Sequence, residues 1–373
     1  MQASDRSFMG IALAMARRGL GRTWPNPSVG AVIVSPQDPP SILARGWTRP
    51  GGRPHAEAVA LEQAGKAARG ATLYVTLEPC SHHGKSPPCT DAIIAAGIKR
   101  VVCGILDPDP RVAGTGIEKL AAADIEVVLG VMAQSVCAVT AGHLSRVERV
   151  RPRITLKTAV GADGLVPQGE GSPVWVTGEL ARNHAHLLRA RHDAILVGSG
   201  TVKADDPSLT CRLPGMADRS PVRVVLDGSL SLPPSARMLG ARCADAPVWI
   251  ICGTDAPEAR ETSLREQGAV VIRIERGQDG LLDVREVCRI LAQRGITSLL
   301  VEGGPNVAAS FLATGDVDEV ALYQGAVSSG PSGLKPFATA GLEAVTGADG
   351  AFAEVSSRSL DADIFRLFRI KQI

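Results

Sequence analysis

The sequence contains few aromatic residues, little net charge and no long apolar segment. Phe, Trp and Tyr make up only 3% of the 373 residues, so the cores must consist mainly of Val, Leu, Ile and Ala. The formal net charge is +2, which gives no broad basic surface for binding nucleic acid or membranes. No stretch approaches the ~20 apolar residues that a membrane-spanning helix requires. The composition indicates a globular protein of two or three domains.

The N-terminal segment is apolar from Phe8 to Ala16 and ends in Ala-x-Ala, as a secretory signal peptide would. A signal peptide begins with net positive charge, whereas Asp5 and Arg6 cancel here. Ile11 and Met15 share one face of a helix. We therefore expect a packed amphipathic helix at this end, and a cytoplasmic protein.

Most of the eight cysteines give no sign of a disulfide framework. Several lie inside apolar runs, where a cysteine behaves as a small buried hydrophobic residue. Only Cys80 and Cys89 lie in a context that indicates chemistry. The other six are Cys103, Cys137, Cys211, Cys243, Cys252 and Cys288.

The first ~150 residues alternate between strand and helix patterns, which predicts a sheet covered by helices. The predicted strands are residues 29–34, 71–77, 101–105 and 125–129, and the predicted helices are residues 55–68, 90–97 and 116–123.

A basic segment, residues 146–153, is interpreted as a solvated linker between domains 1–148 and 149–373. The second half again mixes strands and helices, so we expect a second α/β domain. Its predicted strands are residues 154–159, 174–177, 194–197, 222–226, 248–252, 270–274, 298–301 and 319–323, with helices at 179–189 and 284–294.

His55, Cys80 and Cys89 are the ligand set of a zinc site that keeps one coordination position open. Zinc favours His nitrogen and Cys thiolate, and catalytic sites combine three protein ligands with a water. We expect Cys89 to start a helix, where free N–H groups help to hold a thiolate. Zinc lowers the pKa of its water, and Glu57 can pass the released proton to a departing amine. The pattern predicts deamination of a heterocyclic amine.

The spacing differs from the signature of zinc nucleobase deaminases, H-x-E followed by P-C-x-x-C. The H-x-E and P-C parts are intact, but eight residues separate Cys80 from Cys89. A closed structural zinc site with His82 or His83 as fourth ligand stays an alternative, as do two unrelated cysteines. Two rival functions also stay open. One is a deaminase of another nucleoside or a tRNA base, fused to an unrelated nucleotide-binding domain. The other is a structural-zinc module joined to a nucleotide sensor.

The second half lacks a G-x-G-x-x-G motif after any predicted strand, so a Rossmann fingerprint is excluded. Instead, the strand 298–301 runs into Glu302-Gly303-Gly304 and then an apolar helix. Two glycines let the backbone approach a ligand, and a helix N-terminus favours an anion. This pattern predicts a phosphate site, although a plain strand–turn–helix junction would have the same sequence.

Motifs of the first half resemble the bifunctional riboflavin-biosynthesis deaminase-reductase family. The long loop within residues 76–89 is specific to this family among cytidine-deaminase-like proteins. The other motifs are residues 25–30, 54–57 and 107–114. The resemblance implies that Asn26 and Lys85 contact the pyrimidine substrate. On the residues alone, Asn26 would be a turn former and Lys85 a solvated loop charge.

The resemblance continues through the second half, for example at residues 156–159, 175–177 and 302–304, and so spans nearly the whole chain. It implies a dihydrofolate-reductase-like fold that uses NADPH, with Lys157 and Asp205 nearest the hydride-transfer centre. It implies substrate contacts from Ser172, Arg189, Leu209, Arg212 and Glu302. It implies cofactor contacts from Ala159, Trp175, Thr201, Asp205, Ser229, Gly304, Pro305, Asn306, Val307, Ala308, Ala309 and Ser310.

Several of these residues also have a purely structural interpretation. Arg189 and Arg212 could be surface charges, Trp175 a core residue, and residues 205–207 a simple turn.

Three positions depart from the family pattern. Many relatives carry a substrate-contacting His where Thr48 stands here, and they often carry Asn in place of Asp109. Leu165 replaces a Lys. These changes concern substrate contacts and leave the zinc chemistry intact.

The expected fold class is α/β, with an N-terminal cytidine-deaminase-like domain and a C-terminal dihydrofolate-reductase-like domain. The expected function is two consecutive steps of riboflavin synthesis. The first domain would deaminate 2,5-diamino-6-ribosylamino-4(3H)-pyrimidinone 5′-phosphate with one Zn²⁺ per chain. The second would reduce the ribosyl group to ribityl with NADPH. Expected partners are small phosphorylated pyrimidines and further copies of the chain, with no nucleic acid and no membrane.

Overall fold

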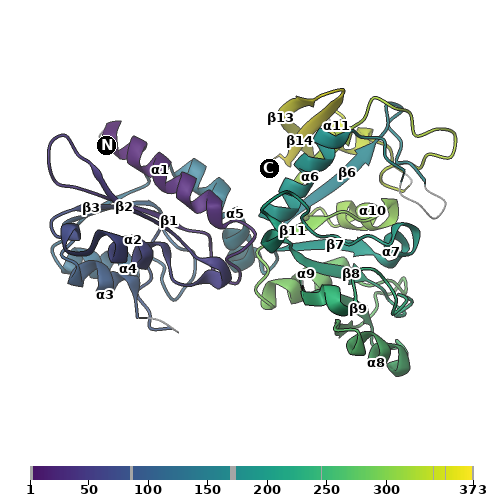
Figure 1. The fold of residues 1–373 in the computed structure, drawn as a ribbon, viewed down its shortest axis with the longest axis horizontal. Helices are drawn as coiled ribbons and strands as arrows, with labels where there is room; N and C mark the ends of the chain where they lie inside the picture. The colour runs from purple at the N-terminus through teal and green to yellow at the C-terminus, as the bar shows by residue number, and fades with distance from the viewer. Residues whose placement is uncertain are drawn as a thin grey trace. The chain divides into compact units, whose positions relative to one another are not determined.

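A computed structural model describes residues 3–84, 87–168, 174–244, 246–338, 340–348 and 350–371. The chain divides into two compact units, residues 1–151 and 152–373, each with its own sheet (Figure 1). The predicted boundary after residue 148 falls at the end of the last helix of the first unit, which ends at Arg149.

The first unit is built on a five-stranded sheet of order β2-β1-β3-β4-β5. β1 pairs antiparallel with β2 and β3, whereas β3, β4 and β5 are parallel to one another. The segments after β3 and β4 therefore leave the sheet at the same edge. The strands are β1 (Gly30–Val34), β2 (Ile42–Trp47), β3 (Thr72–Leu77), β4 (Arg100–Ile105) and β5 (Glu126–Leu129).

Side chains of the central strands alternate between two cores, because successive residues of a strand point to opposite faces. In β3, Leu73 and Val75 belong to one core and Tyr74 to the other. The predicted amphipathic helix is confirmed, since α1 buries Met9 and Leu13. The first face is covered by α2 (Ala56–Ala64), α3 (Cys89–Ala95) and α4 (Thr115–Ala122), and the second by α1 (Ala3–Gly19) and α5 (Ala133–Arg149).

Gly46 allows the start of α2 to lie directly on β2. A Cβ atom at this position would lie 2.1 Å from the carbonyl oxygen of Ala56 and 2.8 Å from the nitrogen of Ala60. A side chain of any size would therefore push the helix away from the strand. Because Ala56 directly follows His55, this contact fixes the position of His55 relative to the sheet.

The second unit contains a nine-stranded sheet of order β10-β9-β8-β7-β11-β6-β12-β14-β13. Strands β6 to β12 are parallel, and β14 pairs antiparallel with β12 and β13. None of the described helices is long and apolar enough to cross a bilayer. The strands are β6 (Arg153–Val160), β7 (Ala194–Gly198), β8 (Val222–Leu226), β9 (Val248–Gly253), β10 (Val270–Ile274), β11 (Ser298–Val301), β12 (Glu319–Gln324), β13 (Phe352–Leu360) and β14 (Asp363–Ile370). The helices are α6 (Glu179–Arg191), α7 (Ser199–Asp205), α8 (Glu258–Glu266), α9 (Val284–Gln293), α10 (Pro305–Ala313) and α11 (Glu343–Thr346).

Two predicted segments are wrong. Residues 174–177 are irregular, not a strand. The Val176 carbonyl lies against Gly325, where a Cβ would be only 1.7 Å from its oxygen, so this segment packs on the end of β12 without joining the sheet. The basic segment 146–153 is not a free linker, since its first four residues close α5 and Arg153 begins β6. No sequence pattern indicated β2, α5 or the β13–β14 hairpin.

Replacing Gly46 with Ala is expected to lower the melting temperature, because overpacking of this kind costs about 1–3 kcal/mol. Gly10→Ala is the matched control: it lies within α1, and nothing comes within 4 Å of an added Cβ there. That change should be neutral or stabilising, since Ala favours a helix over Gly by up to about 1 kcal/mol. Thermal unfolding followed by circular dichroism measures both. An unchanged melting temperature for Gly46→Ala would contradict the close packing of α2 on β2.

Candidate active sites

The three predicted zinc ligands come from separate elements and meet at one point. His55 directly precedes α2, Cys80 follows β3, and Cys89 is the first residue of α3. Their ligand atoms all lie within 4.8 Å of one another. Nδ1 of His55 is 3.6 Å from Sγ of Cys80 and 3.4 Å from Sγ of Cys89. The backbone N–H of Cys89 also donates to the sulfur of Cys80 at 3.3 Å, as a helix start can.

The composition of this cluster fits a catalytic zinc ion. One imidazole and two thiols are donors that Zn²⁺ prefers. Neither His82 nor His83, both within the described part of the chain, belongs to the group of ligand atoms within 4.8 Å. A structural site would require four protein ligands. The residues therefore fit a zinc ion that keeps one position for water.

Glu57 lies in the first turn of α2, next to these ligands, and is 3% exposed. Burial raises the pKa of the Glu57 carboxyl, and the nearby His55 partly offsets this effect. A carboxyl with a raised pKa can both accept and release a proton near neutral pH. Hydrogen bonds from Cys89 and His55 lower the pKa of the Cys80 thiol to about 4, although burial opposes them. This shift favours the thiolate of Cys80, the form that binds a metal.

Asn26 is fixed beside the His55 ring. Its Nδ2 donates to the carbonyl of Gly52 at 2.8 Å and lies 3.3 Å from Nε2 of His55. Gly52 has φ +83°, and a Cβ there would lie 2.8 Å from the Cβ of Asn26. Only glycine fits this conformation and this contact without strain.

Glu78 anchors the segment that carries Cys80. No sequence motif indicated this role. Its side chain is buried, and its two oxygens accept hydrogen bonds from four backbone N–H groups. Several N–H donors are what a buried carboxylate requires. The donors are Asp107 at 3.2 Å, Gly114 at 3.0 Å, Gly116 at 2.9 Å and Ile117 at 3.3 Å. The segment after β3 is thereby tied to the segment after β4 and to the start of α4.

Three other positions singled out in this half have different outcomes. Lys85 lies outside the described residues. Thr48 is 1% exposed and its hydroxyl accepts the N–H of Val29 at 3.0 Å, so it links the residue after β2 to the residue before β1. Asp109 pairs with Arg111, and this hydrogen bond lowers the pKa of the Asp109 carboxyl to about 2.

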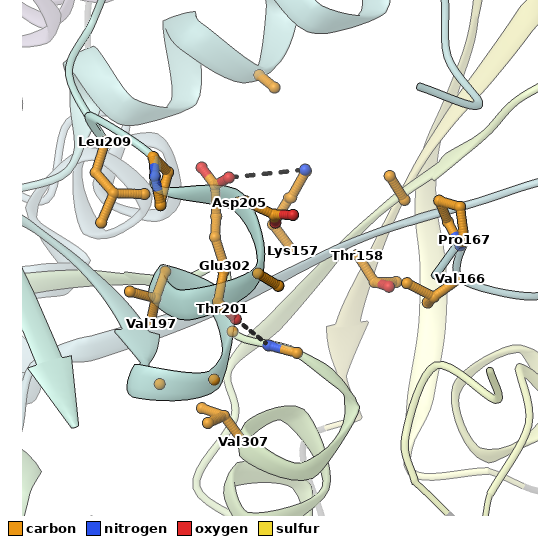
Figure 2. A pocket seen from close by; sticks show the side chains of 18 of the residues that line it. Lys157, Thr158, Val166, Pro167, Val197, Thr201, Asp205, Leu209, Glu302 and Val307 are labelled. Atoms are coloured by element: carbon orange, nitrogen blue, oxygen red, sulfur yellow. Dashed lines mark hydrogen bonds and ion pairs between the residues drawn. The ribbon is translucent and has the colours of Figure 1, made fainter. Parts of the chain in front are cut away.

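The second unit contains a cavity of about 1010 Å³ (Figure 2). It lies where β6, β7 and β11 meet the starts of α7 and α10. Most predicted reductase residues line it: Lys157, Ala159, Trp175, Arg189, Thr201, Asp205, Leu209, Arg212, Glu302, Gly304, Pro305, Asn306 and Val307. Ser229, Ala308, Ala309 and Ser310 are not among the lining residues, and Ser172 lies outside the described residues.

Glu302 forms a buried ion network with Arg189 and Lys157. Arg189 donates through Nε and Nη2 to the two carboxylate oxygens at 2.9 Å each, and Nζ of Lys157 lies 3.7 Å from Oε2. Burial alone would raise the pKa of the Glu302 carboxyl, but the charges of Arg189 and Lys157 outweigh burial and lower it to about 2. Figure 2 shows Lys157, Asp205 and Glu302 pointing into the same part of the cavity.

The structural alternatives for two residues are now excluded. The side chain of Arg189 is only 15% exposed and pairs with Glu302, so it is not a surface charge. Trp175 is 61% exposed, so it is not a core residue. Its ring lies 5.2 Å from the guanidinium of Arg182 at the cavity wall.

The glycine-rich turn after β11 has the form expected of an anion site. The N–H of Gly304 donates to the hydroxyl of Thr201 at 3.2 Å, as Figure 2 shows. A Cβ on Gly303 would lie 2.6 Å from the side chain of Val307. The turn therefore packs tightly at the start of α10, where backbone N–H groups are available to a ligand.

The cavity also contains residues that no motif indicated. His186 and Arg237 both line it. His186 lies on α6 and Arg237 in a loop after β8, and neither is part of a motif that indicated a site. Only the tertiary fold brings them to the site.

Together the two units define a class of protein: a zinc-dependent deaminase fused to an α/β reductase domain. Family models agree with this division. Residues 2–105 match the cytidine and deoxycytidylate deaminase zinc-binding region, and residues 152–364 match the RibD C-terminal domain. The second match alone covers more than half of the chain, which therefore belongs to the RibD family of riboflavin biosynthesis proteins.

Relatives of known identity match along most of this chain. It is 43% identical to riboflavin biosynthesis protein RibD of Bacillus amyloliquefaciens, over 86% of this chain and 84% of the relative. It is 38% identical to RibD of Escherichia coli strain K12, over 86% and 87%. Among solved structures, RibD of Acinetobacter baumannii superposes with a TM-score of 0.85 at 32% identity and covers 99% of both chains.

These matches confirm the predicted family and the predicted fold class of two α/β domains, cytidine-deaminase-like and then dihydrofolate-reductase-like. The protein is a bifunctional enzyme, with a zinc-binding deaminase domain and a reductase domain. The two rival functions, an unrelated second domain and a structural-zinc module, are thereby excluded.

Replacing Glu78 with Gln is expected to weaken the zinc site without touching a ligand. The amide would present its NH₂ group to N–H donors and leave part of the network unsatisfied, which costs about 1–3 kcal/mol. Zinc content per chain and melting temperature should both fall. The exposed Glu118→Gln on α4 serves as control and should change neither. Full zinc content and wild-type stability in Glu78→Gln would show that the network does not support Cys80.

Proposed function

We propose that the first unit removes the 2-amino group of 2,5-diamino-6-ribosylamino-4(3H)-pyrimidinone 5′-phosphate, and that the second unit then reduces the ribosyl group of the product to ribityl. The name of a solved relative from Thermotoga maritima describes a diaminohydroxyphosphoribosylaminopyrimidine deaminase and 5-amino-6-(5-phosphoribosylamino)uracil reductase. That relative is 36% identical over 98% of this chain, with a TM-score of 0.82. Substrates of this kind are small phosphorylated pyrimidines.

The observation that carries the deaminase step is a three-ligand site with a buried carboxyl beside it. His55, Cys80 and Cys89 would hold the zinc ion, which supplies a water of lowered pKa. Glu57 would accept a proton from that water at its carboxylate and deliver it to the departing nitrogen as ammonia leaves. Asn26, fixed beside His55, would hold the pyrimidine ring. Lys85 is proposed as a second substrate contact on the family resemblance alone.

In the second unit, NADPH would supply a hydride to the sugar C1′. The turn at residues 303–307 and Thr201 would bind its phosphates through backbone N–H groups and a hydroxyl. Lys157 and Asp205 are the ionisable side chains that we place at the reacting carbon. Glu302 holds Lys157 in the cavity through their contact at 3.7 Å. The other proposed cofactor contacts are Ala159, Trp175 and Ser229, and the other proposed substrate contacts are Ser172, Arg189, Leu209 and Arg212.

Glu57→Gln is expected to reduce ammonia release about 10²–10⁴-fold, because proton transfer by a positioned carboxyl contributes an effect of that size. Zinc content should stay near one ion per chain, since Glu57 is not a ligand. Glu62→Gln, an exposed position on the same helix, is the matched control and should keep the wild-type rate. Ammonia release at the wild-type rate by zinc-loaded Glu57→Gln would refute the mechanism.

The purified chain, supplied with the diamino substrate and NADPH, is expected to oxidise one nicotinamide for each ammonia released. The order matters, because reduction should begin only after deamination. Following nicotinamide absorbance and ammonia in the same sample measures both steps, and a parallel sample with NADH measures cofactor preference. Deamination without any nicotinamide oxidation would leave the first activity standing and remove the second.

A homo-oligomer also stays a prediction. Light scattering coupled to size exclusion tests it, and a mass equal to one chain at working concentration would contradict it.

A further inference from the structure

The reductase cavity is lined by more positive charge than its lining carboxylates balance. Among the described lining residues, the carboxylates are Asp205 and Glu302. The cations are Lys157, Arg182, Arg189, Arg212, Arg237 and Arg242. Glu302 is already engaged by Arg189 and Lys157. Uncompensated positive charge in a concave site favours an anionic ligand.

Arg212 is one of these cations, and the charges of Arg189 and Arg237 act on it. Its Nη1 is 3.4 Å from the hydroxyl of Ser208, and no described carboxylate lies within ion-pair distance of it. Burial and the charges of Arg189 and Arg237 lower the pKa of its guanidinium. Arg212 stays protonated because arginine holds its proton strongly. An anion in contact with it would therefore stabilise its buried positive charge.

Arg237 approaches Arg212 from the loop after β8. Its backbone N–H donates to Oδ1 of Asp206 at 2.7 Å, and its Nε lies 3.9 Å from Oδ2 of the same carboxylate. Asp206 itself has φ +38°, a left-handed conformation that turns the chain at the end of α7. The Arg237 side chain stays 57% exposed, so its remaining N–H groups are open to a ligand in the cavity.

His186 approaches Arg212 from the opposite element, α6. It is 9% exposed and lines the cavity, and its Nδ1 atom is buried without a hydrogen-bond partner among the described residues. A buried polar atom without a hydrogen bond is uncommon unless a ligand or water supplies one. Burial, Arg189 and Arg212 lower the pKa of the imidazole to about 4, so His186 adds no charge that would repel the arginines before an anion binds.

We propose that His186 and Arg237 complete, with Arg212, a seat for the 5′-phosphate of the reductase substrate. The inference rests on the proposed function and extends it, because neither His186 nor Arg237 is among the residues that the family resemblance assigned. The two arginines donate to phosphate oxygens. Nδ1 of His186 shares one proton with a third oxygen, since a phosphate monoester carries a proton part of the time near its second pKa of about 6. The seat thus selects a phosphorylated sugar over the free sugar.

Steady-state kinetics of the full-length protein with NADPH test this seat. The deaminated pyrimidine is supplied with or without its 5′-phosphate to wild type, Arg237→Ala, His186→Leu and His186→Gln. Arg237→Ala and His186→Leu should raise KM for the phosphorylated substrate about tenfold or more, the scale of one lost charge-assisted hydrogen bond. Their kcat should stay within about threefold, and KM for the unphosphorylated substrate should not change. His186→Gln keeps a hydrogen-bonding side chain and should recover most of the loss.

Inorganic phosphate provides a readout that does not depend on turnover. Calorimetric titration should show weaker phosphate binding in Arg237→Ala and His186→Leu, but not in the control Arg289→Ala, an arginine on α9 outside the cavity. Unchanged phosphate affinity in both variants, or a KM that rises equally for both substrates, would overturn the proposal. Loss of phosphate binding in a protein whose wild type oxidises no nicotinamide would support the seat and refute the proposed reduction instead.

Discussion

Each active site contains a buried carboxylate that requires hydrogen-bond donors or a cation. Moving a carboxylate out of water is costly unless its oxygens receive hydrogen bonds or face a cation. Glu78 meets this requirement with four backbone N–H groups. Glu302 meets it with Arg189 and Lys157. In each case the satisfied carboxylate ties together segments that are distant in the sequence, and those segments carry the residues of the site.

The zinc ligands show how such local constraints combine. Cys80 is held by the segment that Glu78 anchors. Cys89 begins α3, and its backbone N–H donates to the sulfur of Cys80. His55 is placed by the contact of α2 with Gly46. These contacts together bring the three ligand atoms within 4.8 Å of one another. Ligands that are held in this way lose little freedom when a metal binds, which favours affinity and a defined geometry.

The sequence predicted those parts of the structure that local patterns determine. Apolar runs indicated the buried strands, and residue type with spacing indicated the zinc ligands and Glu57. β13 was missed because every residue between Phe352 and Leu360 is exposed or half-buried, on both faces, and the segment is mostly polar, so it carries no apolar run. Residues 174–177 were assigned wrongly because an apolar segment that packs beside a sheet has the composition of a strand.

Tertiary contacts set the remaining features. The hydroxyl of Thr48 accepts the N–H of Val29, a contact that no sequence pattern indicated. His186 and Arg237 carry no motif, because the role proposed for them depends on which elements line the cavity with Arg212 and not on their sequence neighbours. Spacing along the chain cannot specify such distances, since each depends on how α6, α7 and the loops after β8 pack.

The proposed phosphate seat would also let a nearly neutral protein select a phosphorylated substrate. A net charge of +2 provides little long-range attraction for a phosphate. The positive charge is concentrated in the reductase cavity, which has six cationic side chains and two carboxylates among its described lining residues. Charges in a partly buried cavity interact more strongly and are screened less by salt than charges on an exposed surface. In this proposal, selectivity for a phosphorylated sugar depends on distances inside one cavity and not on composition, which is why the overall charge gave no sign of it.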